Sequence, residues 1–234
     1  MALVDDMKGE VEKIFREQWT TRAGQVVPEP EVIKLGNDAV EFENATVLYA
    51  DLSGSTAMVD GYSWGFAAEV YKTFLYCAAK LVLAEGGKIT SYDGDRIMGV
   101  FVGDSQCTSA VRCSLKINYA VLNVVNPALK ARYPNIEYQV KQVVGIDTSS
   151  IRAARTGVRG GNDIVWVGRS ANYAAKLTDL NLAERTWITK AVYDKLNVDV
   201  KFGGQPKQDI WKNFIWNAYG NLPIYGSTWW WSIQ

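Results

Sequence analysis

The chain contains no histidine in its 234 residues. This absence excludes Ser–His and Cys–His nucleophilic catalysis, imidazole acid–base chemistry and any histidine-ligated zinc site. Cysteine is scarce, since Cys77, Cys107 and Cys113 are the only three and form no CxxC pair. They lie in helical patterns, so we expect buried thiols in a reducing compartment rather than disulfides. Catalysis is therefore expected to rest on carboxylates, cations and bound metal.

The chain also lacks a surplus of either charge, because Lys plus Arg and Asp plus Glu both number 25. A balanced sequence gives no global basic field that would indicate a nucleic acid or an anionic membrane as partner. No apolar run approaches the ~20 residues of a membrane span. The N-terminus has neither the basic start nor the apolar core of a signal peptide. We therefore expect a cytoplasmic protein that binds neither nucleic acid nor membrane.

One apolar run ends on a carboxylate at Asp51. Residues 45–50 are rich in strand formers, and a loop of Ser53, Gly54, Ser55 and Thr56 follows the acid. A carboxylate is a hard oxygen ligand for Mg²⁺ or Mn²⁺, and such a loop can offer N–H and hydroxyl groups to phosphates. On these residues alone, a capping Asp followed by ordinary turn residues is an equally good interpretation.

A second acid follows in a hairpin pattern at residues 88–101. The Asp-Gly pair predicts that Asp93 and Gly94 form the turn and that Asp95 begins the second strand. If this hairpin pairs beside the strand that ends at Asp51, the two carboxylates meet at one edge of the sheet. Two acids beside a loop of Gly, Ser and Thr predict a metal–triphosphate site.

The order of the remaining elements predicts an α+β fold. Hydrophobic spacing predicts helices at 5–18, 62–85, 105–125, after Gly168 and at 190–196, and further strands at 138–146, 164–167 and 186–189. Residues 20–44, which hold two prolines, are expected to form a surface connector. The order βαββαβ is the ferredoxin-like split unit. We divide the chain into an N-terminal helix and connector (1–42), a core domain (43–200) and a Trp-rich extension (201–234).

Three motifs together resemble the class III nucleotidyl cyclases. They read Tyr49-Ala-Asp51-Leu-Ser-Gly-Ser-Thr56, Gly94-Asp95 and Gly168-Arg-Ser-Ala-Asn172-Tyr-Ala-Ala-Lys176-Leu177, in the family's order. The resemblance covers about residues 43–196, and implies that 43–200 is a cyclase catalytic domain of ferredoxin-like fold. It implies that Asp51, Asp95 and the Leu52 carbonyl hold two Mn²⁺ or Mg²⁺ ions.

The resemblance also assigns roles on the helix that opens at Gly168. In the family its Asn orients the ribose and its basic residue, normally Arg, stabilises the transition-state phosphate; here these are Asn172 and Lys176. Lysine lacks the planar fork of arginine, which leaves its role open. Arg152 and Arg155 could serve the terminal phosphates instead, with solvated loop charges as an equal alternative. The family implies a head-to-tail homodimer in which the metal acids of one protomer face the Asn172 helix of the other.

The base pocket is where the sequence departs from the purine cyclases of this family. Their purine-reading Lys and Asp or Cys are replaced by Ser91 and Val165, and Ser55 replaces a Phe of the metal loop. Tyr49, in place of Phe, would line the pocket from the partner protomer and make it smaller, which favours a pyrimidine. The chain is thus most similar to the bacterial pyrimidine cyclases of the Pycsar antiphage system, whose cyclic UMP or cyclic CMP reaches an effector as an alarm signal.

We expect UTP as the substrate from the overall similarity of the chain to these cyclases. No single residue distinguishes UTP from CTP. A cytidylate cyclase, a purine cyclase, a catalytically silent nucleotide-binding domain and a diguanylate cyclase are the alternatives. Retention of Asp51, Asp95 and Asn172 argues against a silent domain, and the lack of a Gly-Gly-acid-acid-Phe run argues against a diguanylate cyclase. The tryptophans of 201–234 are expected to pack on the core or the dimer, with a docking surface as the alternative.

Overall fold

A nine-stranded mixed sheet is the centre of the computed structural model, which describes residues 2–180 and 182–234. Its strand order is β10-β11-β7-β5-β2-β4-β3, and β1 and β6 pair with β2 and β5. The strands of this sheet are β1 Thr20–Ala23, β2 Asp38–Leu52, β3 Lys88–Asp93, β4 Arg96–Phe101, β5 Gln142–Val158, β6 Gly161–Val167, β7 Thr186–Thr189, β10 Lys212–Trp216 and β11 Leu222–Ser227. A separate two-stranded ribbon consists of β8 Phe202–Gly203 and β9 Gln208–Asp209.

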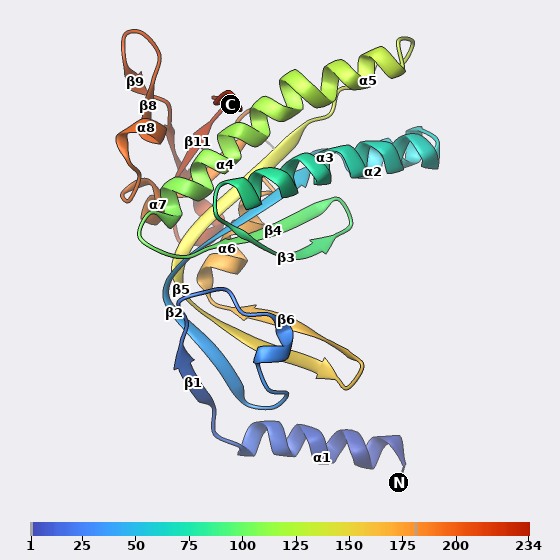
Figure 1. The fold of residues 1–234 in the computed structure, drawn as a ribbon, viewed down its shortest axis with the longest axis vertical. Helices are drawn as coiled ribbons and strands as arrows, with labels where there is room; N and C mark the ends of the chain where they lie inside the picture. The colour runs from blue at the N-terminus through green and yellow to red at the C-terminus, as the bar shows by residue number, and fades with distance from the viewer. Residues whose placement is uncertain (1, 181) are drawn as a thin grey trace.

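Two long antiparallel strands, β2 and β5, run through most of the molecule and curve as they do so (Figure 1). Their register extends from Ala39 opposite Ala154 to Leu52 opposite Gln142, with a shift between Phe42 and Ala45. A strand rises about 3.3 Å per residue, so the two ends of this ladder are about 40 Å apart. Residues at opposite ends of β2 and β5 therefore cannot form one site within a single chain.

Helices cover both faces of the upper part of the sheet. The helices are α1 Leu3–Arg16, α2 Ser55–Gly61, α3 Trp64–Ala84, α4 Gln106–Ala120, α5 Asn126–Arg132, α6 Arg169–Leu177, α7 Lys190–Tyr193 and α8 Val198–Lys201, with a π-helix η2 Val121–Val125 and short 3₁₀ turns η1 Pro30–Val32 and η3 Asn217–Tyr219. Helix α3 begins where Ser63 Oγ accepts a hydrogen bond from the backbone N–H of Phe66. The π-helix joins α4 and α5 into one long rod (Figure 1).

The alternation of β2 sends its side chains into two separate cores. Leu48, Ala50 and Leu52 belong to the large core under α3 and α4. Val47 and Tyr49 belong to a second cluster that includes Ala174 of α6. Because side chains alternate along a strand, Asp51 shares the α6 face with Tyr49. The carboxylate of Asp51 therefore lies on the α6 face of the sheet, at the end of the apolar part of β2.

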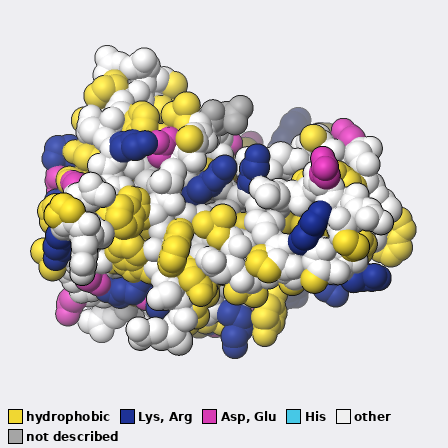
Figure 2. Space-filling model, turned by 90° about the horizontal axis from the view of Figure 1, so that it is seen from above, with side chains coloured by type: hydrophobic (Ala, Val, Ile, Leu, Met, Phe, Trp, Pro, Cys, Tyr) yellow, Lys and Arg dark blue, Asp and Glu magenta, His cyan; other side chains and the backbone are white. Residues whose placement is uncertain are grey.

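The C-terminal segment adds strands to the β7 edge and tryptophans to the cores. Trp211 lies in the large core, and Trp216 lies in a third cluster with Trp187 and Ile224. Trp229 and Trp231 pack against the large core. Figure 2 views the molecule from above; Lys and Arg side chains are dispersed there among hydrophobic patches and a few acids. No helix of the described residues combines the length and the apolarity that a membrane span needs.

The observed order β2-α3-β3-β4-α4-β5 with β6, α6 and β7 contains the predicted βαββαβ unit, so the fold prediction is confirmed. Two predicted boundaries are wrong. The connector does not extend to Asn44, because β2 begins at Asp38, where pairing with β5 draws the polar residues of 38–44 into the sheet. The strand predicted at 138–146 is β5, which begins at Gln142 and continues to Val158.

Candidate active site

Asp51 lies at the end of β2 and is held by an arginine of the neighbouring strand. The Arg96 Nε and Nη2 atoms donate to Asp51 Oδ2 at 3.0 and 2.7 Å. The guanidinium lies 5.8 Å from the centre of the Tyr49 ring. Arg96 begins β4, and Ile97 pairs with Ala50, so the register of β2 and β4 brings Asp51 and Arg96 together. The three side chains form a continuous polar strip on the α6 face.

Asp95 lies in the hairpin turn rather than in the second strand. Asp93 pairs with Arg96, so the two central turn residues are Gly94 and Asp95, one residue later than predicted. Gly94 has φ +60°, which is the conformation that a type II′ turn requires at its first central position. The Oδ2 atom of Asp95 is buried and has no hydrogen-bond partner. An unpartnered buried carboxylate oxygen beside a second acid suits a cation ligand.

The two carboxylates influence one another electrostatically. Burial raises the pKa of the Asp51 carboxyl above its ordinary value, and the nearby charge of Asp95 raises it further, while the Arg96 guanidinium opposes both effects. Mg²⁺ and Mn²⁺ bind through one or two carboxylates and complete their shells with water and substrate phosphate oxygens. Within the described residues no group of three or more metal-ligating side chains is present. The donor set therefore fits an ion that shares its coordination with a nucleotide.

The predicted phosphate loop follows Asp51 directly. The side chain of Leu52 is buried in the large core, which leaves only its backbone for a ligand role. Ser53 and Gly54 form the turn into α2, where Gly54 adopts a left-handed conformation with φ 77°. Ser55 and Thr56 form the first turn of α2, and no side chain caps that end. The free N–H groups of a first helical turn can donate to phosphate oxygens.

Helix α6 carries Asn172 and Lys176 and packs directly on β5. A Cβ atom at Gly145 would lie 2.1 Å from the carbonyl oxygen of Ala174, so glycine is required for this close approach. Asn172 and Lys176 are both exposed on the helix. The Lys176 Nζ lies 3.4 Å from Asp179 Oδ2. The structure places these two side chains on one exposed face, as predicted, with no contact to Asp51 or Asp95 among the hydrogen bonds of the described residues.

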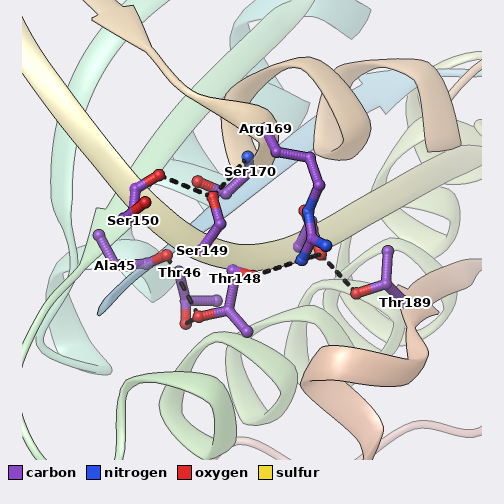
Figure 3. Close-up of polar contacts among 9 residues, drawn as sticks. Ala45, Thr46, Thr148, Ser149, Ser150, Arg169, Ser170 and Thr189 are labelled. Carbon is purple, nitrogen blue, oxygen red and sulfur yellow. Dashed lines mark hydrogen bonds and ion pairs between the residues drawn. The ribbon is translucent and has the colours of Figure 1, made fainter. Parts of the chain in front are cut away.

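The N-terminal end of α6 is anchored by a polar network (Figure 3). Arg169 donates to the fully buried Asp147 at 3.0 Å and to the Thr148 carbonyl at 2.8 Å. Thr189 donates to the same carboxylate at 2.5 Å. The backbone N–H of Ser170 donates to Ser149 Oγ at 3.0 Å. These bonds fix the position of α6, and therefore of Asn172, against β5.

Only part of the predicted base pocket is assembled within one chain. Tyr49 and Ser91 both pair with Met98, so they lie in one row across β2, β4 and β3. Val165 lies in β6 opposite Ala154, at the far end of the β2–β5 ladder. At about 3.3 Å per residue, Val165 is about 30 Å from Tyr49. A pocket that uses both residues requires two chains.

Arg152 and Arg155 are strand residues of β5, so they are not the loop charges that the sequence left open as an alternative. Arg152 pairs with Glu41 in the ladder and forms an ion pair with its carboxylate. Arg155 Nε donates to Asn162 Oδ1 at 2.7 Å. Pairing with β2 and β6 extends β5 through these polar residues. Within one chain Arg152 is about 30 Å from Asp51 along the ladder, and Arg155 is about 40 Å from it.

Arg96 is the site residue that sequence reasoning missed. It follows Asp95 directly and alternates with Met98 and Val100, which belong to the α6-face cluster. A charged residue at the first position of an otherwise apolar strand is the sequence feature that could have identified Arg96 as a site residue. A cavity of about 560 Å³ lies between α3 and the η2–α5 segment, and its lining combines apolar residues such as Val125 and Leu129 with the charged Glu69, Lys72 and Arg132. None of the predicted site residues lines it.

Comparisons with known proteins show which family the chain is similar to. No model of a protein family matches the chain. A protein named uridylate cyclase from Burkholderia cepacia is 48% identical over 234 residues, which cover 100% of both chains. A second uridylate cyclase, from Xanthomonas perforans, is 46% identical over 235 residues and is also covered completely.

Solved structures with the same fold include two nucleotide cyclases. The guanylyl cyclase Cya2 has a TM-score of 0.67 and 17% identity, covering 79% of this chain and 91% of that chain. The adenylyl cyclase CyaB from P. aeruginosa has a TM-score of 0.63 and 18% identity, covering 81% and 95%. These likenesses confirm the class III cyclase fold.

Proposed function

The chain belongs to the uridylate cyclase family, and on that premise we propose that it converts UTP into 3′,5′-cyclic UMP and pyrophosphate. The observation that carries the proposal is the likeness to uridylate cyclases over the full length of both chains, at up to 48% identity. The local geometry supports it, because Asp51 and Asp95 converge beside a loop whose N–H groups can meet phosphates. In the reaction, the ribose 3′-oxygen loses its proton and attacks the α-phosphorus, and the bond to the pyrophosphate oxygen breaks.

The residues of this chain act chiefly by positioning and electrostatics. Asp51, Asp95 and the Leu52 carbonyl would hold divalent ions, Mn²⁺ or Mg²⁺, which when bound favour ionisation of the 3′-hydroxyl and neutralise the triphosphate. Arg96 opposes the rise in the pKa of Asp51 and holds its carboxylate through two hydrogen bonds. The turn at Ser53 and Gly54 and the first residues of α2 receive phosphate oxygens.

We propose further that the active site is composite and forms across a head-to-tail homodimer. Asp51, Asp95 and Tyr49 lie at one end of the β2–β5 ladder, whereas Val165, Arg152 and Arg155 lie at the other. A separation of about 30 Å is too large for one bound nucleotide. A two-fold operation that places one end of each ladder against the other end of its partner would bring the two sets together twice. Helix α6 packs on β5 at Gly145, and the resemblance to the cyclase family supports the proposal that its exposed Asn172 and Lys176 face the metal acids of the second protomer.

The metal role is tested with Asp51→Ala and Asp95→Ala, using Asp93→Ala as the matched control. Asp93 is an exposed acid of the same hairpin and does not belong to the proposed site. Both site variants should lose cyclic UMP formation in the presence of Mn²⁺, while circular dichroism and size remain unchanged. The control should keep most of the activity. Near-normal turnover of Asp95→Ala at saturating Mn²⁺ would remove the two-carboxylate proposal.

The composite site is tested by mixing two inactive variants. An Asp51→Ala protomer and an Asn172→Ala protomer leave one of the two sites intact in the mixed dimer. Mixing should therefore restore up to about a quarter of the wild-type activity, because half of the dimers are mixed and each has one working site. If mixed dimers form without any rescue, the two residues do not serve a shared site.

Three further points stay predictions from the resemblance. They are the cytoplasmic location, the use of Mn²⁺ or Mg²⁺, and the role of cyclic UMP as an antiphage signal for a downstream effector. The signalling role is supported only by the likeness to the pyrimidine cyclases of antiphage systems. Measurement of cyclic UMP in cells before and after phage infection tests it. An increase that depends on Asp51 is the expected result.

A further inference from the structure

Two buried amides link the C-terminal end of the chain to the metal loop, residues 51–56. Asn118 of α4 and Gln142 of β5 are each 2% exposed, and Gln142 Nε2 donates to Asn118 Oδ1 at 2.9 Å. The Asn118 Nδ2 atom donates to the carbonyl oxygens of Thr228 at 3.0 Å and Trp229 at 2.9 Å. These bonds form an amide chain that connects the C-terminal segment with the first residue of β5.

The amide chain ends beside the metal loop. Gln142 lies opposite Leu52 in the β2–β5 ladder. The carbonyl oxygen of Lys141 accepts a hydrogen bond from the backbone N–H of Ser53 at 2.8 Å. Residues 141 and 142 therefore set the position of two backbone groups of the site. One is the Leu52 carbonyl, a proposed metal ligand, and the other is the start of the turn that would receive phosphate oxygens.

A second asparagine holds the same segment from the other side of a π-helix. Asn126 Nδ2 donates to the Val140 carbonyl at 3.0 Å, and Asn126 Oδ1 accepts from the Val140 N–H at 2.8 Å. In a regular α-helix, residues eight positions apart, such as Asn118 and Asn126, point about 80° apart. The π-helix η2 between them inserts one residue and reduces this angle to about 20°. Both amides therefore face residues 140–142.

The amide chain gives the loop a fixed position that apolar packing would not give. Burial of a polar group costs free energy unless its hydrogen bonds are made, and a matched pair of apolar side chains can be nearly as stable. A hydrogen bond, however, fixes a distance and an angle, whereas the hydrophobic effect has no direction. The arrangement of these amides therefore suits the positioning of a neighbouring site.

The C-terminal segment is anchored independently of Asn118, beside α4 (Figure 1). The backbone N–H of Trp231 donates to the Leu115 carbonyl at 3.2 Å, and Trp231 Nε1 donates to the Asp199 carbonyl at 3.1 Å. The side chains of Trp229 and Trp231 pack against the large core. The tryptophans thus hold two backbone carbonyl groups in place to accept from Asn118.

We propose that residues 228–231 hold the metal loop in its ion-binding position through Asn118 and Gln142. The proposal rests on the proposed cyclase function, because it concerns the loop of that site. Asn118 and Gln142 are positioning residues, since each acts through the backbone of Leu52 or Ser53. Loss of an outer partner of a metal ligand typically costs about 10–100-fold in metal affinity or activity.

Hydrogen–deuterium exchange of the metal-free protein tests the position of the loop without ions or nucleotide. Asn118→Leu removes the amide chain and should speed exchange in the peptide that contains residues 51–56 by about tenfold or more. The matched control, Thr108→Val, removes another buried hydrogen bond of α4, in which Thr108 Oγ1 accepts from the Asn197 N–H at 3.1 Å. This control should leave exchange of residues 51–56 unchanged.

Two neighbouring tryptophans test the part played by the C-terminal segment. Trp231→Ala removes an anchor of the segment and should speed exchange of residues 51–56 as Asn118→Leu does. Trp230→Ala changes the adjacent residue, which is 45% exposed, and should not. A peptide from β4 in the same samples should exchange at the wild-type rate, which separates a local effect on the loop from a loss of global stability.

Titration with Mn²⁺, followed by the electron paramagnetic resonance of the free ion, provides a readout besides activity. In the presence of a UTP analogue that cannot be cyclised, Asn118→Leu should raise the Mn²⁺ dissociation constant about 10–100-fold, and Thr108→Val should not. In Asn118→Leu with Gln142→Met, two apolar side chains face each other, so the melting temperature should recover while Mn²⁺ binding stays weak. An amide chain that served stability alone would regain both together.

Three results would overturn the proposal. They are equal exchange of residues 51–56 in Asn118→Leu and Thr108→Val, recovery of Mn²⁺ affinity in the double variant, and an effect of Asn118→Leu that Trp231→Ala does not reproduce. Gln142→Met alone provides the same comparison if Asn118→Leu does not fold. Because exchange needs no nucleotide, a protein with these exchange differences but without cyclic UMP formation would contradict the proposed function and not the positioning of the loop.

Discussion

Replacement of Arg96 by alanine should destabilise the metal-free protein and make it more dependent on divalent ions. The guanidinium donates twice to Asp51 Oδ2, at 2.7 and 3.0 Å, and the two side chains are 29% and 16% exposed. Loss of one partner costs about 3–5 kcal/mol in a fully buried pair and about 0–1 kcal/mol in an exposed one. For this partly buried pair we expect an intermediate loss of stability, about 2 kcal/mol.

The cost can be measured as a melting temperature. For a chain of this size, about 1 kcal/mol corresponds to about 2–4 °C, so Arg96→Ala should melt about 4–8 °C below the wild type in EDTA. A divalent ion supplies the positive charge that the guanidinium provided to Asp51. Mn²⁺ should therefore raise the melting temperature of the variant more than that of the wild type.

A lysine of the same hairpin provides the matched control. Lys88 pairs with Glu29 at the surface, where both side chains are about half exposed. Lys88→Ala should melt close to the wild type, with an unchanged response to Mn²⁺. Two results would refute the reasoning: an Arg96→Ala variant as stable as the wild type in EDTA, or a Mn²⁺ response equal to that of the wild type.

Three further substitutions test other parts of the site. Gly145→Ala forces α6 away from β5, because the added Cβ would meet the Ala174 carbonyl, and should lower stability by about 3 kcal/mol in thermal melts, whereas Gly65→Ala, with open space around it, should not. Burial raises the pKa of Asp147 above its ordinary value near 4, so its contribution to stability is present at low pH and lost as pH rises through the folded pKa. The stability of Asp147→Asn relative to the wild type should therefore increase as the pH rises, in thermal melts at a series of pH values that begins below the ordinary aspartate pKa. Tyr49→Ala should reduce the preference for UTP over ATP, by a factor of about 10–200 if pocket size alone discriminates, in steady-state kinetics.

The fold could be predicted from the sequence because its main signals are local. The apolar run before Asp51 and the Asp-Gly pair of the hairpin each specify an element without reference to the rest of the chain. The position of the turn could not be predicted, since it depends on how β3 pairs with β4. That one-residue difference is why Arg96 was missed, although it lies beside both predicted carboxylates.

Long-range pairing also explains why the sequence left a loop open as an alternative at Arg152 and Arg155. Ser149, Ser150, Thr156 and Gly157 give this part of the chain the composition of a loop. Pairing with β2 on one side and β6 on the other satisfies the backbone hydrogen bonds and makes the segment a strand. The distance between Val165 and Tyr49 follows from the same ladder, so the structural argument for the proposed composite site could not be made from the sequence.

A competition among the four ribonucleoside triphosphates tests the central claim most directly. The purified protein is incubated with Mn²⁺ and equal concentrations of UTP, CTP, ATP and GTP, with Asp51→Ala as the blank, and the cyclic products are separated by chromatography. The account predicts that 3′,5′-cyclic UMP is the main product, with cyclic CMP next, and that the blank forms neither. Cyclic AMP or cyclic GMP as the main product would contradict the assignment of UTP, and no cyclic product above the blank would contradict cyclase activity itself.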